Sequence, residues 1–354
     1  MPPPASALNT LLQAAVLAPS GDNTQPWRFV VDHAQRSILL EVDPTRDPSP
    51  MNAGQRMARI SLGAALENMA RTANHNAWRY EIRDDSSSGM VRFQLNTDAG
   101  PGTIDPLLAL RVTNRRVYVR NELTAEALER IRPTVSDADT TRTTFLTDPE
   151  VLKALVPLIG RADALILGTK PIRNAFLSKV RFDVAPNDAV DEGLSLGSLE
   201  VSRMDRISLR LMRFLQPSDK LMQVLGARRI FAQVATRLAA SASGFCVITS
   251  TGDDERADIQ VGRAWQRGWL RLTEEGFATQ PMMSLLVLQN LLDHHLAEIL
   301  RKPDRAAARR LLEEFCTFIS TLADGRPAAL LRFGQAEAPT AKVRRLAPER
   351  FMRA

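Results

Sequence analysis

The sequence predicts an α+β fold built from antiparallel hairpins and many helices, and two observations carry this prediction. First, apolar residues recur at helical spacing in 7–18 and again in 55–73. Second, short β-prone segments occur in two pairs, each joined by a polar turn, which is the pattern of β-hairpins. The expected strands are 27–31 with 37–42, and 78–83 with 91–95.

Residues 1–98 are expected to form a compact N-terminal half. The first helix should end at Pro19, because proline disfavours helical geometry in the residue before it. Asp32–Arg36 forms the expected turn of the first hairpin, and a loop rich in Pro and Asp follows at 43–53. The long helix and the second hairpin, with its turn at 84–89, complete this half.

The remaining residues, 99–354, are expected to form a larger and mainly helical C-terminal half, which begins with a linker at 99–106. Two apolar segments, 245–250 and 328–334, are predicted as strands. The segment 186–240 is rich in Met and Arg, and is interpreted either as a lid over a site or as a peripheral pair of helices. The helices expected in this half are 106–118, 124–132, 150–168, 170–181, 199–215, 219–239, 255–276, 282–298 and 303–322.

Composition excludes several classes of protein. With 44% hydrophobic and 24% charged residues, the 354-residue chain is globular rather than disordered. Its two cysteines, Cys246 and Cys316, stand alone, so zinc fingers, iron–sulfur clusters and a disulfide scaffold are excluded. One cluster of metal-ligand residue types, at 293–298, lacks further ligands, so no metal site is predicted.

The sequence gives no indication of secretion or of a membrane span. It lacks a signal peptide, and no apolar run approaches the roughly 20 residues that cross a bilayer. We therefore expect a cytoplasmic protein without a membrane partner. The net charge of +6 has three interpretations: solvated helix faces, a concave site for a phosphorylated ligand, or nucleic-acid binding. No nucleic-acid-binding motif accompanies the charge, so no nucleic-acid partner is expected.

The commonest catalytic motifs are absent from the sequence. It contains no GxGxxG after a strand, no GxxxxGK[ST], no HExxH and no GxSxG. A Rossmann dinucleotide site, a P-loop NTPase, a zinc protease and an α/β-hydrolase therefore have no support.

The most informative segment is APSGDNTQPWRF at 18–29. Here a helix ends, a polar turn follows, and a strand begins at Trp27. Ser20, Asn23 and Gln25 offer hydrogen-bond donors and acceptors at the edge of a sheet, which suits a planar heterocycle with alternating N–H and C=O groups. The alternative is a capping turn whose tryptophan fills the core.

This segment resembles the APSxxNxQPWxF signature of the nitroreductase superfamily, whose members are FMN-dependent oxidoreductases. A second segment, LRVTNRRVY at 110–118, resembles the family's RRSxRxF signature. In that signature Arg and Ser or Thr side chains hold the FMN phosphate, and the charge-assisted donors of arginine suit this task. The resemblance assigns the role to Arg111, Thr113, Arg115 and Arg116; the alternative is a basic helix face.

Two weaker similarities concern the C-terminal part of the chain. LRFG at 331–334 followed by KVRR at 342–345 resembles the family's C-terminal end, which implies that Lys342 and Arg344 reach the phosphate. The helix 260–275 ends at Gly276, where the family has a loop beside the flavin ring. Two tryptophans on this helix, Trp265 and Trp269, are expected to pack in the core.

The order of the motifs departs from that of ordinary family members, in which the arginine motif comes first. It resembles a fused-half, lid-bearing branch of the superfamily called the Acg type. The resemblance implies a nitroreductase-like fold with antiparallel-rich central sheets flanked by helices. Its two lobes, 1–98 and 99–354, would form an intramolecular pseudo-dimer around one FMN site. The chain would then act as a monomer or as a homodimer.

The function implied is an FMN-dependent oxidoreductase with NADH or NADPH as reductant. Hydride would pass through flavin N5 in ping-pong fashion to a small-molecule acceptor such as a nitroaromatic or a quinone. Arg28 and Arg181 are candidates for the basic group beside flavin N1 and O2. The first rival is a lid-covered protein that stores or sequesters FMN without NAD(P)H-dependent activity. The second is a basic helical interaction protein that binds no flavin.

Overall fold

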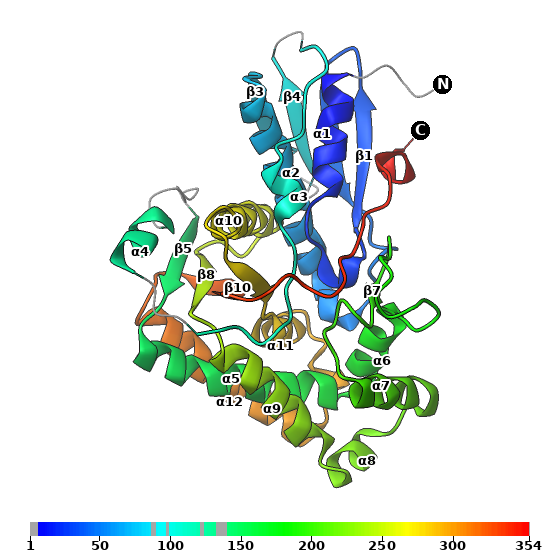
Figure 1. The fold of residues 1–354 in the computed structure, drawn as a ribbon, viewed down its shortest axis with the longest axis vertical. Coiled ribbons are helices and arrows are strands. Elements are labelled where there is room, and N and C mark those ends of the chain that lie inside the picture. The colour runs from blue at the N-terminus through cyan, green and yellow to red at the C-terminus, as the bar shows by residue number, and fades with distance from the viewer. Residues whose placement is uncertain (1–5, 86–89, 97–98, 121–123, 132–139, 354) are drawn as a thin grey trace.

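Two four-stranded antiparallel sheets, each covered by helices, form the body of the protein (Figure 1). The computed structural model describes residues 6–85, 90–96, 99–120, 124–131 and 140–353. The combination of many helices with antiparallel sheets confirms the expected α+β class. The last four residues of the expected turn at 84–89, and the last residue of the helix expected at 124–132, lie outside the described residues.

The first sheet is built from the two predicted hairpins and has the order β1-β2-β4-β3. Alternate residues of β4 are buried, so one face of the sheet packs against helices. The core between them includes Trp27, Phe29 and Phe93. The elements of this part are α1 (Ala7–Val16), β1 (Trp27–Asp32), β2 (Ser37–Val42), α2 (Arg56–His75), β3 (Tyr80–Asp85) and β4 (Met90–Leu95).

The second sheet has the order β5-β8-β10-β9, and helices cover both of its faces. Every residue of β8 is buried: Phe245 and Val247 face one core, whereas Cys246 and Ile248 face another. The strands are β5 (Thr141–Leu146), β8 (Gly244–Ser250), β9 (Ala278–Pro281) and β10 (Arg326–Gly334). The helices against them are α5 (Pro149–Gly168), α10 (Glu255–Glu274), α11 (Ser284–Asp293) and α12 (Lys302–Ser320).

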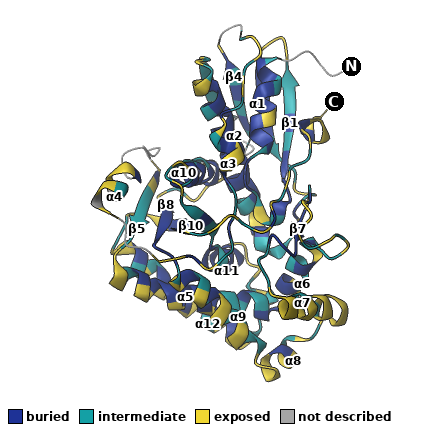
Figure 2. Ribbon diagram, in the orientation of Figure 1, coloured by how far each residue is buried: buried dark blue, intermediate teal, exposed yellow. Residues whose placement is uncertain are grey.

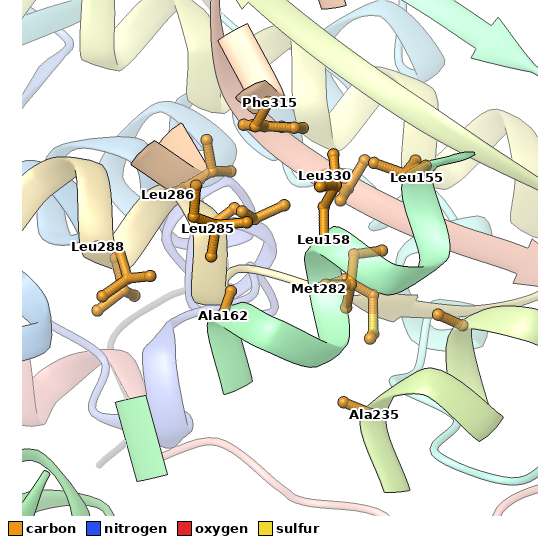
Figure 3. Packing of buried hydrophobic residues seen from close by; sticks show 14 of the residues in the cluster. Leu155, Leu158, Ala162, Ala235, Met282, Leu285, Leu286, Leu288, Phe315 and Leu330 are labelled. Carbon is orange, nitrogen blue, oxygen red and sulfur yellow. The ribbon is translucent and has the colours of Figure 1, made fainter. Parts of the chain in front are cut away.

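The larger core lies between the second sheet and α5, α11 and α12. Figure 3 shows Leu158 of α5, Leu285 and Leu286 of α11, Phe315 of α12 and Leu330 of β10 meeting there. Burial of such side chains stabilises each by about 1.5–3 kcal/mol relative to exposure. This core holds the sheet and its helices together as the base of the site described below.

The two sheets meet through α2 and α10, which cross at Gly63 and Gly262. A Cβ at either glycine would lie 3.0 Å from the Cα of the other and would collide with the backbone carbonyl of Ile259 or Ile60. Only glycine allows the two backbones to approach this closely. The contact is reciprocal. Gly63 faces the carbonyl of Ile259, and Gly262 faces the carbonyl of Ile60, which lies at the corresponding position of the other helix.

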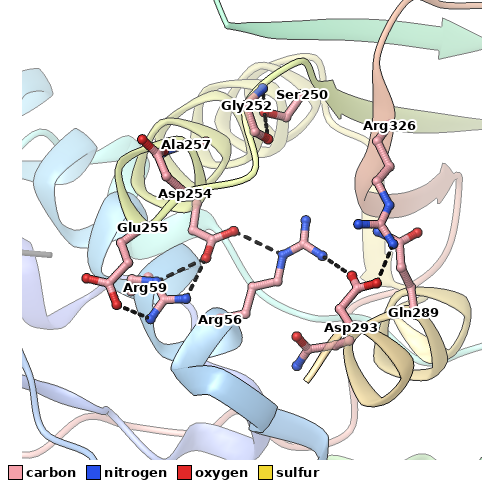
Figure 4. A network of polar contacts seen from close by, with 12 residues as sticks. Arg56, Arg59, Ser250, Gly252, Asp254, Glu255, Ala257, Gln289, Asp293 and Arg326 are labelled. Carbon is pink, nitrogen blue, oxygen red and sulfur yellow. Dashed lines mark hydrogen bonds and ion pairs between the residues drawn. The ribbon is translucent and has the colours of Figure 1, made fainter. Parts of the chain in front are cut away.

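Ion pairs flank this helix crossing. Arg59 of α2 binds Asp258 of α10 at 2.9 Å, and Arg56 binds the same carboxylate at 3.0 Å. Figure 4 follows the network onward from Arg56 to Asp293 of α11 and Arg326 of β10. The predicted N-terminal half is therefore joined to the second sheet by buried polar contacts as well as by helix packing.

The segment between α5 and β8 forms a helical insertion on one side of the second sheet. It contains a two-stranded parallel ladder between β6 and β7. Its elements are α6 (Lys170–Lys179), β6 (Val180–Arg181), β7 (Leu194–Ser195), α7 (Arg203–Leu215), α8 (Asp219–Val224) and α9 (Ala227–Ala240).

The C-terminal tail crosses from the second sheet to the first (Figure 1). Met352 pairs with Phe29 of β1, and the backbone N–H of Arg353 donates to the Phe29 carbonyl at 2.9 Å. Phe351 packs edge-on against Trp27, with ring centroids 6.0 Å apart. The end of the chain thus belongs to the core of the N-terminal sheet.

Several predicted elements differ from the structure. The helix expected at 106–118 is wrong: α3 (Leu107–Leu110) ends before Arg111, and Thr113 pairs with Thr279 beside β9. The segment contains Val112, Thr113 and Val117, which favour extended backbone. The single helix expected at 219–239 is two helices, α8 and α9, separated at Gly226 with φ +68°.

Other differences concern the ends of elements and two short strands. The helix expected at 282–298 ends at Asp293, and the one expected at 199–215 begins only after Ser202, which caps α7. β5 and β9 were not predicted, because each is short and partly polar. The remaining helix in the described part of the chain is α4 (Ala125–Ile131). None of the helices described is both long and apolar enough to cross a bilayer.

Candidate functional site

A cavity of about 250 Å³ lies where the two sheets, the insertion and the C-terminal tail meet. Both sequence motifs contribute to it: Ser20 and Asn23 from the turn after α1, and Arg111, Thr113 and Arg115 from the second motif. The two motifs, about 90 residues apart in sequence, are therefore brought to one site. Further lining residues are Asp22, Asp47, Met51, Asn52, Met57, Ile60, Ser61, Leu194, Ser198, Trp265, Trp269, Pro281, Met283, Val287, Ala341, Val343 and Arg345.

The turn after α1 has an unusual backbone. Asp22, Asn23 and Gln25 all have left-handed conformations, with φ values of 47°, 58° and 52°. Asn and Asp tolerate this conformation better than most residues, because their short polar side chains bond locally. The Ser20 hydroxyl fixes the turn by accepting from the Gln25 backbone N–H at 3.0 Å. The polar residues of this motif thus shape the loop as well as line the cavity.

The insertion and the C-terminal tail hold the side chain of Asn23 in place. Its side-chain nitrogen donates to the backbone carbonyls of Asp191 and Arg344, at 3.0 and 3.2 Å. Its Oδ1 is buried and has no hydrogen-bond partner. Buried polar atoms are nearly always paired, so this oxygen is available to a donor on a ligand or a water molecule.

Gln25 does not line the cavity. It is fully buried, its Nε2 donates to the Asp191 carbonyl at 2.8 Å, and its Oε1 accepts from the Leu346 backbone N–H at 2.9 Å. Gln25 therefore ties the turn to the insertion and to the C-terminal tail. Its amide is occupied by these contacts instead of facing a ligand.

Three arginines at the cavity have no acidic partner within 4.0 Å among the described residues. Arg111 lies over the ring of Trp269, with 4.5 Å from its guanidinium carbon to the ring centroid, and its Nε is buried without a partner. Arg115 donates to the Ser198 carbonyl at 2.9 Å. Arg345 donates from Nε to the Ala18 carbonyl at 3.0 Å. Backbone oxygens satisfy part of the donor capacity, and none of the three charges has a carboxylate in direct contact among the described residues.

Burial makes these charges costly. It lowers the pKa of Arg111 to about 9, with repulsion from Arg345 adding to the effect, and lowers the pKa of Arg345 to about 10. The pKa of Arg115 is also lowered by burial, which nearby Asp22 partly offsets. An anion placed between these groups would restore lost solvation and would accept charge-assisted hydrogen bonds.

Two carboxyl groups also line the cavity. Burial raises the pKa of Asp22 to about 6, with repulsion from Asp47 adding to the rise and attraction to Arg115 opposing it. The pKa of Asp47 is raised as well, mainly by burial. Asp22 is therefore able to hold or release a proton close to neutral pH.

Lys342 and Arg344 lie beside the cavity rather than in it. They line an adjoining hollow of about 470 Å³ that shares Arg111, Thr113 and Arg345 with the cavity. Both side chains are exposed, and Arg344 binds Asp191 at 2.9 Å. Ala341, Val343 and Arg345 line the cavity itself, so the tail presents alternate residues to it.

The other predicted residues lie outside both hollows. Arg116 is paired with Glu337 at 3.1 Å. Gly276 has φ +78° and follows the end of α10, where a Cβ would meet nothing within 4 Å. Arg28 and Arg181 are each paired with a nearby carboxylate. The structure does not bring these four residues to the cavity.

Sequence reasoning missed Arg345 and Asp22. Arg345 had a detectable signal, because in an extended KVRR segment Val343 and Arg345 share one face while Lys342 and Arg344 share the other. For Asp22, no comparable feature of the sequence distinguished it from the other polar residues of its turn. Trp265 and Trp269 pack in the core as expected and also form part of the cavity wall.

Part of the insertion contacts the residues of the site. Residues 190–198 supply the carbonyls that bind Asn23, Gln25, Arg115 and the backbone of Arg344, and Leu194 lines the cavity. The helices that follow lie farther out, with α9 against α5. Among the described residues, no group of three or more His, Cys, Asp or Glu side chains could hold a metal ion.

Comparisons with known proteins do not by themselves assign a family to this chain. No family model matches it. The uncharacterized protein MT1398 of Mycobacterium tuberculosis (strain CDC 1551 / Oshkosh) is 25% identical over 354 aligned positions, which cover 97% of this chain and 47% of that protein. The chain thus spans about half the length of this curated relative.

Among solved structures, the chain is similar to the FMN and NADPH-dependent nitroreductase NfnB from Sphigopyxis sp. strain HMH. The TM-score is 0.31 at 17% identity, and the match covers 65% of this chain and 87% of that one. A TM-score this low carries no argument about the fold or the function of this chain.

Proposed function

We propose that the cavity binds FMN and that the protein is a flavin-dependent oxidoreductase. The observation that carries this proposal is a group of three arginines, none with an acidic partner within 4.0 Å, at a cavity that two motif-bearing segments build together; they are Arg111, Arg115 and Arg345. One buried and two half-buried cations without an acidic partner within 4.0 Å are costly to hold together, and a bound anion offsets part of this cost. The motif resemblance identifies the anion as a flavin phosphate.

The donor set fits an FMN molecule. Arg111, Thr113, Arg115 and Arg345 would hold the phosphate, and Lys342 and Arg344 would reach it from the adjoining hollow. Ser20 and the unpaired Oδ1 of Asn23 would face the polar edge of the ring. Apolar side chains suit the ring's flat faces; they are Met57, Ile60, Trp265, Met283 and Val287. Arg116, Gly276 and Gln25 are left out of this assignment.

When bound, FMN supplies hydride transfer between NADH or NADPH and a small electron-poor acceptor, such as a nitroaromatic or a quinone. The side chains of the protein would bind the FMN, orient its ring and shield it from water. The guanidinium groups fix the phosphate, and the apolar walls exclude water from the ring. The Asp22 carboxyl, with its pKa of about 6, is placed to hold a proton at the cavity wall.

We further propose that the two sheets are the two lobes of a fused dimer of the Acg type, with 1–98 as one lobe and 99–354 as the other. The reciprocal contact of Gly63 with Gly262 supports this, because equivalent helices of two similar lobes would meet on such an axis. Residues 190–198 would act as the lid. One chain would then hold about one FMN, without needing a second chain to complete the site.

A spectroscopic experiment tests the proposal. The purified chain is incubated with FMN, freed of excess by gel filtration, and mixed with NADPH or NADH without oxygen. The proposal predicts retained yellow colour that bleaches on adding the reductant and returns with a quinone. Retained colour without bleaching would favour a protein that stores flavin, and a colourless chain that takes up no FMN would reject both functions.

A further inference from the structure

The helical insertion exposes an apolar surface that the proposed flavin site does not use. Of the fifteen large hydrophobic side chains that are exposed in the described part of the chain, ten lie between residues 204 and 234. Phe214 is 84% exposed, Val224 78% and Met204 70%. A cluster of this kind on a soluble protein usually marks a contact with a partner. The ten residues are Met204, Ile207, Leu211, Phe214, Leu215, Leu221, Val224, Leu225, Ile230 and Val234.

Helix α7 turns most of its apolar side chains toward solvent, whereas an ordinary surface helix turns them toward the core. Leu209 and Met212 are its half-buried apolar residues, and it lies beside α6 (Figure 1). Met204, Ile207, Leu211, Phe214 and Leu215 all point away from the body, within a sector roughly 100° wide at about 100° per residue. Figure 2 shows exposed residues along α7.

Local contacts hold α7 helical without burial of its apolar face. The Ser202 hydroxyl accepts from the Asp205 N–H at 3.2 Å, and the Asp205 carboxylate accepts from the Ser202 N–H at 3.1 Å. This reciprocal capping box stabilises the first turn. None of the residues of α7 is buried, so the helix presents its outward face preformed.

The same segment is strongly basic. Residues 203–237 contain eight Arg and Lys and two Asp, so this segment alone accounts for the chain's formal net charge of +6. On α7, Arg203 and Arg210 lie beside the edge of the apolar sector, and Arg213 is farther around the helix. No ion pair involves these three arginines among the described residues. Charge is therefore available on the same side as the apolar residues.

We propose that α7 and α8, with the first turns of α9, form a docking surface for an anionic lipid membrane. Apolar side chains flanked by arginines match the boundary between acyl chains and negatively charged headgroups. A second copy of the chain is the less suitable occupant, because it would bring two basic surfaces together. The protein would lie on the membrane, since none of its described helices can span one. This inference goes beyond the proposed flavin chemistry and revises the expectation of no membrane partner.

Vesicle co-sedimentation with the full chain tests the proposal. The vesicles are phosphatidylcholine alone, or phosphatidylcholine with about one-third phosphatidylglycerol. We expect at least about 10-fold stronger binding to the anionic vesicles, falling at least about 10-fold when NaCl rises from about 0.05 to about 0.5 M. Equal binding to both vesicle types, or to neither, overturns the proposal.

Two variants separate the apolar contribution from the charge contribution. Leu211→Gln with Phe214→Gln keeps good helix formers on α7, and should reduce binding to anionic vesicles at least about 10-fold. Arg203→Gln with Arg210→Gln and Arg213→Gln should weaken the salt dependence of binding, because other basic residues of the segment remain. The control, Leu296→Gln with Arg309→Gln, changes an exposed apolar and an exposed basic residue elsewhere and should bind like the unmodified chain. Unchanged binding in the first variant, or a concentration-dependent dimer that this variant abolishes while no vesicle binding occurs, overturns the proposal.

Discussion

Replacing Arg111 by Gln should weaken binding of FMN far more than binding of riboflavin, which has the same ring but no phosphate. The Arg111 guanidinium makes one backbone hydrogen bond, at 3.2 Å, and its Nε has no partner. A phosphate would gain charge-assisted hydrogen bonds, each contributing about 1.5–3 kcal/mol. This corresponds to about a 10- to 150-fold weaker FMN complex in the variant.

Fluorescence titration of both ligands measures the effect. Riboflavin affinity should change by less than about 3-fold, because the ring contacts remain. The matched control is Arg116→Gln, since Arg116 comes from the same motif but is paired with Glu337 outside the cavity. An equal loss of FMN and riboflavin affinity in Arg111→Gln, or an equal FMN loss in Arg116→Gln, would refute the assignment of Arg111 to the phosphate.

Three further predictions concern the ligand-free protein. Because the pKa of Asp22 is raised to about 6 in the folded state, that state binds more protons than the unfolded state between about pH 4 and pH 6, and the free energy of unfolding falls as pH rises through this window. Asp22→Asn should therefore raise the free energy of unfolding by about 1–3 kcal/mol at pH 8 and change it little at pH 4. Urea denaturation at the two pH values measures the effect. An equal effect at both would contradict the assignment of Asp22 as a buried carboxyl group. Gly63→Ala should lower the free energy of unfolding by about 2–3 kcal/mol, because the added Cβ meets the backbone of α10. Gly100→Ala is the control and should change it little, because a Cβ there meets nothing within 4 Å. Similar melting temperatures for the two variants would argue against the close helix crossing. Gln25→Ala should lower the free energy of unfolding by about 1–3 kcal/mol, because the Leu346 N–H and the Asp191 carbonyl lose a hydrogen-bond partner. It should also speed proteolysis within 190–198. An unchanged cleavage pattern would show that Gln25 does not anchor the insertion.

Much of the N-terminal sheet could be predicted from the sequence because its signals are local. The segments 27–31 and 37–42 alternate or concentrate apolar residues on either side of a polar turn, and they pair as β1 and β2. Helix 55–73 agrees closely with α2, since apolar periodicity persists over its whole length. The patterns that predict these elements lie within the segments themselves, although α2 and β1 also contact distant parts of the chain.

The elements that were mispredicted depend on distant partners. Residues 111–119 are not helical, and two of them are tied to distant segments: Thr113 pairs with Thr279 and Val119 with Gln335. No local pattern reveals these contacts. β9 has only four residues and is a strand because β10 lies alongside it. Lys342 and Arg344 were chosen from the motif alone; the structure places them at the adjoining hollow and places Arg345, which the motif did not single out, at the cavity.

The candidate site was predicted in part. Ser20, Asn23, Arg111, Thr113 and Arg115 all line one cavity, as the two motifs implied. What the sequence left open was the role of each polar group within a motif. Only the fold shows that the amide of Gln25 is consumed by backbone contacts.

The central claim is that both lobes of one chain build a single flavin site. The most direct test is the stoichiometry of FMN retained by the purified chain, obtained by releasing the flavin and measuring flavin and protein separately. The account predicts about one FMN per chain, falling in Arg111→Gln. A ratio near two would contradict the single shared site, and a ratio near zero at saturating FMN would contradict flavin binding altogether.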